Sequence, residues 1–117
     1  MKNYVTDTCD WVNYVGIWWK TKDEIQYALQ TYHNQVFENV RMEKRKVNIR
    51  FVSYDVAIVH FYWYIDAFDA PDGTNRGDNE NLATIIFVRK EDKWLITATQ
   101  IAEIDEQAQA FDPVKNK

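Results

Sequence analysis

The chain has 117 residues, 46% of them hydrophobic and 15% aromatic, with a formal net charge of −4. So much apolar surface excludes intrinsic disorder, and a chain of this length forms a single domain, residues 1–117, with a real core. The acidic balance argues against a nucleic-acid partner. The main basic cluster, residues 41–46 (RMEKRK), is interrupted by Glu43, and we interpret it as a solvated connector.

Cys9 is the only cysteine, which excludes an internal disulfide and a four-ligand Cys/His zinc site. The first eleven residues, MKNYVTDTCDW, lack the apolar core of a signal peptide. No run approaches the roughly 18 apolar residues of a membrane-spanning helix. We therefore expect a soluble, cytoplasmic protein without a membrane partner.

The first half of the chain predicts one strand and one helix. Residues 9–16 (CDWVNYVG) have strand composition and stop at a glycine, and Asn13 is expected to hydrogen-bond an irregular strand edge. Thr21 and Glu24 form a capping-box pattern before residues 23–39, which are predicted to be helical. Apolar residues recur there at helical spacing, so one face of the helix lies on something apolar: Ile25, Ala28, Leu29, Tyr32 and Val36.

The second half of the chain predicts consecutive strands. Segments rich in β-branched and aromatic residues span 47–54, 56–68, 81–90 and 93–104. The first and last of the three connections are short enough for hairpins, and the polar segment 69–81 has turn composition. The order indicates an α+β fold with a strongly curved antiparallel sheet wrapped around a helix. The segment 56–68 would extend about 43 Å, and so long a strand usually bends.

Several runs together resemble a known family: DWVNYVGIWWKTKDEI (10–25), YH (32–33), DVAIVHFYW (55–63), KWLITATQ (93–100) and FDPVK (111–115). In this order they are similar to the SgcJ/EcaC group, a SnoaL-like branch of the nuclear-transport-factor-like, or cystatin-like, cone folds. The resemblance implies a bent sheet around helices, a pocket at the mouth of the cone, and a homodimer built through the outer sheet faces. Relatives include polyketide cyclases, ketosteroid isomerase and dehydratases.

The sequence departs from the family pattern at three places. The family normally begins with an additional long helix before the DWVN strand, and this chain has only nine residues there, so we expect that helix to be missing and the pocket to be more open. Leu29 stands where close relatives tend to carry a histidine. The final strand has Gln100-Ile101 in place of a Gln-Asn pair. The pocket is therefore expected to have lost polar members.

The segment 60–66 (HFYWYID) alternates between two kinds of side chain. We predict that His60, Tyr62, Tyr64 and Asp66 face the concave side, where tyrosine rings give apolar area and polar tips serve a ligand. The alternate residues, Phe61, Trp63 and Ile65, are then predicted to form the dimer interface. The alternative is that the aromatic residues on both faces are packing.

His33 and His60 are the only histidines and are the candidate proton carriers if they meet across the cavity. The alternative is that each is an ordinary packed residue. Trp19, Phe37 and Gln100 complete the predicted ligand pocket. Two histidines plus Asp66 could hold a metal, but no spacing enforces such a triad, so we expect no metal and no cofactor.

The prediction is a protein that binds a small apolar or aromatic molecule in a cone pocket. Cofactor-free acid/base chemistry of the isomerase, cyclase or dehydratase type is possible there, because the chain carries imidazoles but no nucleophile or phosphate-binding motif. The alternative is a dimerisation or protein-association module without chemistry. The sequence does not decide whether the chain is an enzyme.

Overall fold

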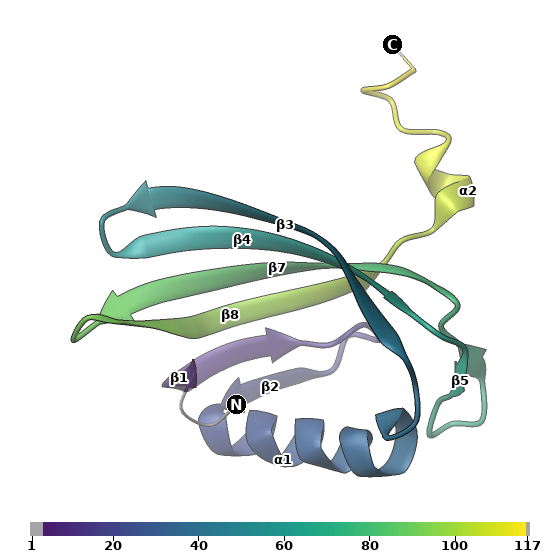
Figure 1. The fold of residues 1–117 in the computed structure, drawn as a ribbon, viewed down its shortest axis with the longest axis horizontal. Coiled ribbons are helices and arrows are strands. Elements are labelled where there is room, and N and C mark those ends of the chain that lie inside the picture. The colour runs from purple at the N-terminus through teal and green to yellow at the C-terminus, as the bar shows by residue number, and fades with distance from the viewer. Residues whose placement is uncertain (1–3, 117) are drawn as a thin grey trace.

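A six-stranded sheet curves over a helix in the computed structural model of the chain, which describes residues 4–116 (Figure 1). Its strands, in the spatial order β2-β1-β8-β7-β4-β3, are β1 (Val5–Val12), β2 (Trp18–Thr21), β3 (Met42–Ser53), β4 (Val56–Ile65), β7 (Asn79–Lys90) and β8 (Lys93–Glu103). The helix, α1 (Lys22–Tyr32), lies against one side of this sheet, which we call the inner face. The opposite side is the outer face.

The predicted helix is present but ends earlier than expected. The Thr21 hydroxyl accepts a hydrogen bond from the Glu24 backbone N–H at 3.1 Å, which confirms the predicted cap. The Glu24 carboxylate accepts in return from the N–H of Lys20, one residue before the cap, at 2.8 Å. The α-helix gives way to a π-helical turn, η2 (His33–Phe37), instead of continuing to residue 39. This wider turn leads the chain directly into β3.

The order of β3, β4, β7 and β8 confirms the predicted run of antiparallel neighbours, joined at its two tips by tight hairpins. The sheet as a whole is mixed, because β1 pairs with β8 in parallel. The prediction of a fully antiparallel sheet was therefore wrong at this strand. No hairpin joins the first and last strands, so no local turn pattern indicates their relative direction.

The first predicted strand lies four residues earlier than expected, because Asn13 begins a turn. Its side-chain oxygen accepts from the backbone N–H groups of Val15 and Ile17, at 3.1 and 2.8 Å. The role predicted for Asn13 is thereby confirmed. The turn reverses the chain, so Trp18–Thr21 forms the additional edge strand β2, which the sequence analysis did not expect.

The long segment 56–68 bends, as expected for its length. β4 ends at Ile65, and the chain continues into a small two-stranded ribbon of β5 (Phe68–Asp69) and β6 (Asn75–Arg76). Gly77 packs against the bend: it has φ +86°, and a Cβ there would lie 2.3 Å from the backbone oxygen of Asp66. Register irregularities in β1, β3 and the β7–β8 pair add to the curvature.

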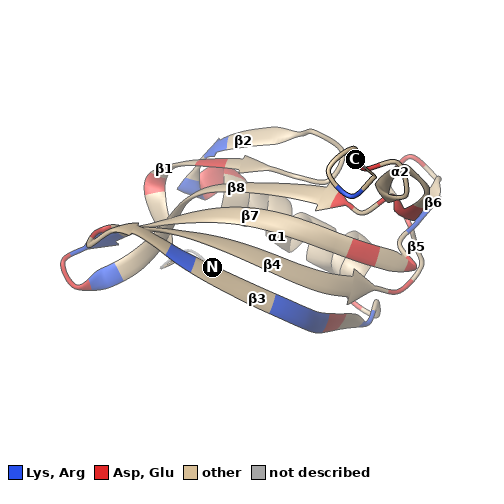
Figure 2. Ribbon diagram, turned by 90° about the horizontal axis from the view of Figure 1, so that it is seen from above, with Lys and Arg blue, Asp and Glu red and all other residues tan. Residues whose placement is uncertain are grey.

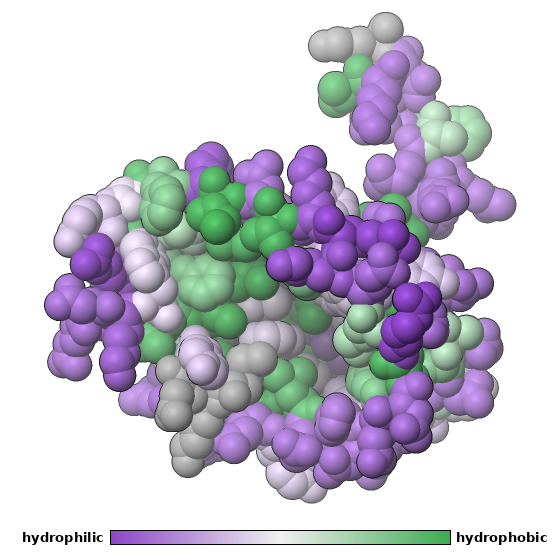
Figure 3. Space-filling model, in the orientation of Figure 1, coloured by the Kyte–Doolittle hydropathy of each residue, from purple (hydrophilic) through white to green (hydrophobic). Residues whose placement is uncertain are grey.

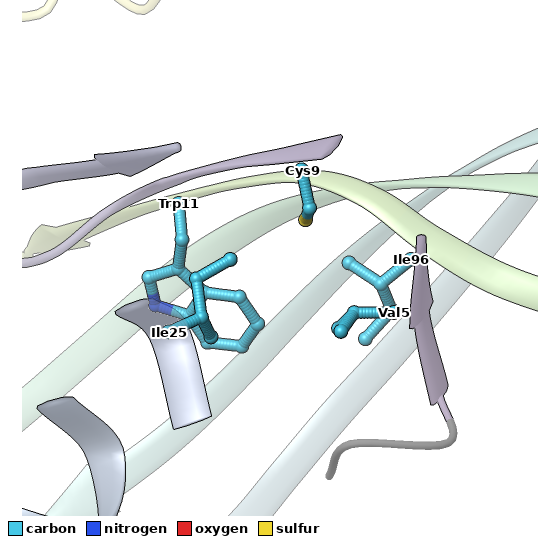
Figure 4. Packing of buried hydrophobic residues seen from close by; sticks show 5 residues of the cluster. All are labelled: Val5, Cys9, Trp11, Ile25 and Ile96. Carbon is cyan, nitrogen blue, oxygen red and sulfur yellow. The ribbon is translucent and has the colours of Figure 1, made fainter. Parts of the chain in front are cut away.

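The core lies between the inner face and the helix. Its main cluster, drawn in Figure 4, consists of Val5, Cys9, Trp11, Ile25 and Ile96. A second cluster of Ile65, Phe68 and Ala70 packs against residues of η2 at the other end of β4. None of the helices in residues 4–116 combines the length and apolarity needed to cross a membrane.

A short final helix, α2 (Glu106–Gln109), leads into an arm that projects away from the sheet (Figure 1). Asp105 caps this helix through a hydrogen bond from the Ala108 N–H to its carboxylate. Phe111 and Val114 on the arm are 83% and 69% exposed. The arm therefore adds little to the core of the domain.

Candidate functional site

The two faces of β4 are the reverse of the prediction. Trp63 packs against Ile65 and Phe68 on the helix side, and Phe61 lines a hollow together with Trp11, which itself packs on the helix residue Ile25. Phe61, Trp63 and Ile65 are therefore on the inner face, and the interface assigned to them is wrong in its placement. The physical reason is that these side chains carry the most apolar surface with the fewest polar atoms, so the helix-covered face takes them.

The predicted concave residues of β4 accordingly point outward. His60 and Tyr62 pair with Thr84 and Leu82 of β7 on the outer face. The Tyr64 hydroxyl donates to the Asp78 carboxylate, and this hydrogen bond raises the pKa of Tyr64. Asp66, at the end of the strand, forms an ion pair with Arg41 at 3.3 Å, so its carboxylate is occupied on the surface.

The two histidines do not meet. His33 lies exposed in η2 on the helix side, whereas His60 is half-buried on the outer face, so the sheet separates them. The condition on which their role as proton carriers depended, that they meet across a cavity, is therefore not met. Among residues 4–116, no group of three or more His, Cys, Asp or Glu side chains is arranged to hold a metal ion.

The remaining predicted pocket residues are packing or surface residues. Trp19 packs on Tyr32 with ring centres 5.9 Å apart, and Phe37 packs edge-on against Phe68 at 4.9 Å. Both lie on the helix side but outside the hollow. Gln100 is exposed on the outer face, where it borders a shallow depression with Thr84.

The inner face nevertheless contains a hollow of about 350 Å³, lined by residues of β1, β3, β4, β7 and β8. Figure 3 shows hydrophobic residues on the walls of the open space between the sheet and the helix. Six apolar side chains from β3, β4, β7 and β8 form the walls: Met42, Phe61, Trp63, Ala83, Ile85 and Ile101. A concave, mostly apolar space of this size is typical of a small-molecule site.

A second hollow of about 210 Å³ continues the same surface toward the β3–β4 hairpin. Val59 lines this second hollow and is the register partner of Ile85, which lines the first. Ile49 and Phe51, on its rim, are 57% and 67% exposed. The inner face therefore carries an apolar surface that extends well beyond the area covered by α1.

Two polar side chains stand at the β1–β8 end of the first hollow. Trp11 and Thr99 line it and are register partners, so they leave the sheet side by side on the same face. They are only 7% and 4% exposed, and neither the Trp11 Nε1–H nor the Thr99 hydroxyl has a hydrogen-bond partner within residues 4–116. A buried polar group without a partner costs about 1–3 kcal/mol of stability, so this pair is an unusual feature of the hollow.

Within the described part of the chain, residues 4–116, Lys44 is the only ionisable residue that lines the first hollow. It stands on the edge strand β3, at the opposite side of the hollow from Trp11 and Thr99, and it is exposed. Its register partner is Trp63, which places it on the inner face. Chemically, the hollow offers apolar walls, two neutral hydrogen-bonding groups and one cation.

Two other groups near the inner layer are held in their neutral forms. Burial, with a smaller contribution from the Asp10 carboxylate, raises the pKa of Cys9 to about 11, so the thiol is protonated at neutral pH. Burial also raises the pKa of Tyr14, against the opposing effect of Arg76. Tyr14 and Arg76 border a separate depression of about 220 Å³ at the end of the cone, where the guanidinium lies 5.6 Å from the tyrosine ring centre.

Sequence reasoning missed the residues that line the hollow: Trp11, Met42, Lys44, Ala83, Ile85, Thr99 and Ile101. The alternation of side chains in residues 81–90 would have predicted Ala83 and Ile85 as lining residues if the inner face of this strand had been assigned correctly. The register that brings Trp11 beside Thr99 is a long-range parallel pairing, and no local pattern indicates it.

No known family model matches the sequence, and no curated protein matches it. Solved structures do. An uncharacterised protein from Caulobacter vibrioides with a cystatin-like fold superposes with a TM-score of 0.94 at 23% identity, over 98% of this chain and 81% of its own. A proposed dehydratase of the NTF2-like family from Streptomyces avermitilis superposes with a TM-score of 0.65 at 17% identity, over 84% and 67%.

A proposed calcium/calmodulin-dependent protein kinase II association domain from Xanthomonas campestris also superposes, with a TM-score of 0.68 at 11% identity, over 90% of this chain and 72% of its own. The chain has the cystatin-like, NTF2-like fold. The predicted α+β cone is thereby confirmed. Because these identities are low, they establish the fold alone, and the narrower SgcJ/EcaC resemblance and the missing N-terminal helix stay predictions.

Proposed function

We propose that the chain is a small-molecule-binding protein of the SnoaL-like, SgcJ/EcaC type, and that its ligand is an apolar molecule held in the hollow of the inner face. The observation that carries this proposal is the unfilled apolar hollow itself. The chain's own side chains leave about 350 Å³ open on the inner face of the sheet, although large apolar residues surround it. Removing such walls from water is the main driving force for binding an apolar ligand.

The lining favours binding over catalysis. Among residues 4–116 no histidine, carboxylate or cysteine lines the hollow, and Cys9 nearby is protonated at neutral pH. His33 and His60 lie outside it, so the acid/base mechanism has no support from their placement. The similar structures do not favour either function, since one is named as a proposed dehydratase and another as a proposed association domain.

The binding proposal is tested by filling the hollow. Ile85→Trp places an indole into it, whereas Ile86→Trp, one residue along the same strand, places the indole on the outer face. The probe is 1-anilinonaphthalene-8-sulfonate, followed by its fluorescence enhancement on the folded protein. We expect the wild-type and Ile86→Trp proteins to bind it and Ile85→Trp to lose at least tenfold in affinity. Equal binding by all three proteins would contradict the proposal.

We also propose that the outer face forms a homodimer, and a specific observation favours it. Half-exposed apolar residues occupy this face on four strands: Val12, Ile58, Tyr62, Leu82, Ile86 and Ala98. Seen from this side, charged residues gather at strand ends and along β3 and leave the central parts of β4, β7 and β8 uncharged (Figure 2). An uncharged, partly apolar centre with a charged rim is typical of protein interfaces.

The dimer is tested by light scattering at micromolar concentration. We expect a mass near 28 kDa, twice the 14.0 kDa of one chain. Ile86→Lys places a charge at the centre of the outer face and should give a monomer, because an unpaired charge in an interface is strongly unfavourable. The control is Phe51→Lys on the exposed rim of the inner face, which should leave the dimer intact. A wild-type protein that is monomeric throughout would contradict this proposal.

A further inference from the structure

The polar groups of the inner hollow are distributed unevenly, and this distribution identifies the class of ligand. Resting on the proposed binding function, we propose that the ligand is an elongated apolar acid of at least two rings. It carries a neutral hydrogen-bonding oxygen at the Trp11–Thr99 end and a carboxylate at the Lys44 end.

The buried pair of Trp11 and Thr99 favours a neutral oxygen atom on the ligand. The indole Nε1–H of Trp11 can only donate, and the Thr99 hydroxyl can both donate and accept. Both are unpartnered within residues 4–116 and more than nine-tenths buried beside the hollow. Thr99 lines the hollow, and rotation about its Cα–Cβ bond lets its hydroxyl reach a ligand there without movement of the backbone. A charged group is disfavoured at this end because the lining there offers no counter-ion.

At the rim of the hollow, Lys44 favours an anionic group on the ligand. Lys44 borders the hollow, and it forms no ion pair with the residues of 4–116, unlike its neighbour Arg45, which pairs with Glu43 at 3.3 Å. A carboxylate at this position would gain a charge-assisted hydrogen bond while remaining in contact with solvent. The apolar stem of the lysine extends the wall formed by Met42 and Trp63.

The separation of the two ends sets the length of the ligand. Lys44 on β3 and Thr99 on β8 are three strand spacings apart, with β4 and β7 between them. The register places Lys44 level with Glu103, four residues along β8 from Thr99. At the usual spacings the two backbones are therefore separated by roughly 14 Å across the strands and roughly 13 Å along them, part of which the lysine side chain covers. A single ring cannot reach both ends, whereas a two-ring rod can. The walls between them are apolar on every intervening strand.

Three probes separate these features: 4′-hydroxybiphenyl-4-carboxylic acid, biphenyl-4-carboxylic acid and 4-hydroxybiphenyl. Isothermal titration of the folded full chain should rank the hydroxy acid first, with about three- to tenfold lost when either polar group is removed. Thr99→Val should abolish the preference for the hydroxyl, and Thr99→Ser should keep it. Thr99→Val should also fold at least as stably as wild type, so a loss of preference is not a loss of structure.

The charge is tested at the other end with a matched pair of lysines. Lys44→Met should abolish the preference for the acid over 4-hydroxybiphenyl. Lys46→Met should not, because Lys46 pairs with Tyr62 and lies on the outer face. A wild-type protein that prefers neither the hydroxyl nor the acid overturns this inference, as does a preference that survives in Thr99→Val and Lys44→Met.

The outcomes also distinguish this inference from the binding function on which it rests. If the biphenyls bind without preference and Ile85→Trp still prevents their binding, the hollow binds small molecules but the assigned class is wrong. If 1-anilinonaphthalene-8-sulfonate binds and no biphenyl does, the class is again wrong. If none of these probes binds, or crystals show the hollow filled by a second copy of the chain, both proposals fall.

Discussion

The inner and outer faces of the sheet are built from the same strands, but their side chains differ in how readily they can be removed from water. On β4 the inner residues Phe61, Trp63 and Ile65 are aromatic or aliphatic throughout, and they alternate with His60 and Tyr62 on the outside. Alternation divides such a strand into two faces, but it does not say which face the helix covers. That choice depends on which set can be buried without leaving polar atoms unpaired.

The difference corrects a natural assumption about pockets. Tyrosine and histidine suit a binding site because their tips can reach a ligand, and on this ground they would belong inside. In this chain the inner face must first pack against α1 and η2, so purely apolar side chains occupy most of it. The two neutral polar groups that line the hollow, Trp11 and Thr99, come from β1 and β8, on the side of the hollow away from β3.

The largest expected effect comes from truncating the same residue type on each face of β4. Ile65 on the inner face is 5% exposed, whereas Ile58 is half-buried on the outer face. Ile65→Ala should lower the free energy of unfolding by about 4 kcal/mol, because it leaves a cavity in the core, and Ile58→Ala by only about 1 kcal/mol. Urea denaturation at low protein concentration, where the monomer predominates, measures both. Equal losses would contradict the assignment of the faces.

The second effect concerns the bend at which β4 ends, where Gly77 packs against the backbone. Gly77→Ala places a Cβ 2.3 Å from the backbone oxygen of Asp66 in a left-handed conformation, and it should cost about 3 kcal/mol. Gly73 has the same φ of +86° but open space around it, so Gly73→Ala should cost about 1 kcal/mol. Thermal unfolding of the two variants separates the clash from the strain. A similar loss in both would show that the close approach at Gly77 is easily relieved.

The third effect tests whether the inner layer is dry. Burial raises the pKa of Cys9 from 9.0 to about 11, so the native state retains a proton that the unfolded chain releases. The thiol therefore favours folding fully below pH 9, and this contribution is lost as the pH rises to about 11. The free energy of unfolding should therefore fall by about 2–3 kcal/mol over this pH range.

The measurement for Cys9 compares the pH dependence of unfolding in wild type and Cys9→Ala between pH 8 and 11. Other groups that titrate in this range are common to both proteins, so the difference belongs to the thiol. In the native wild type at pH 8, Cys9 should also resist modification by a thiol reagent and react only on unfolding. Rapid modification of the folded protein would show that water reaches this layer.

Much of the fold could be predicted because its signals are local. The Thr21–Glu24 capping box, the two tight hairpins and the role of Asn13 each depend on residues within a few positions of one another. Composition and strand order indicated the curved α+β layer. The parallel pairing of β1 with β8 depends on contacts between residues some ninety positions apart, so no turn or periodic pattern indicated it.

The candidate site was less predictable for a related reason. Its lining combines β1, β3, β4, β7 and β8, so it depends on the register of the whole sheet. Choosing the wrong face for β4 exchanged the pocket and interface residues together, because the side-chain period is two. Thr99 has no distinguishing neighbour in sequence. It becomes notable only when Trp11 lies beside it and both lack partners.

The smallest expected effect lies at the β7–β8 hairpin, whose register decides which residues of these strands enter the hollow. Glu91 and Asp92 form its two-residue turn with φ of +51° and +64°, the left-handed conformation of a type I′ turn, which neither residue favours. Replacing the pair with Asn-Gly should stabilise the protein by about 1 kcal/mol, since the Arg89–Asp92 ion pair it removes is largely exposed. Because the turn geometry is unchanged, the pairing of Ile85 with Thr99 and the binding of 1-anilinonaphthalene-8-sulfonate should stay as in wild type. A gain in stability accompanied by weaker binding would mean that the native turn holds a register the strands alone do not prefer, and the inner face would then depend on this turn as well as on burial.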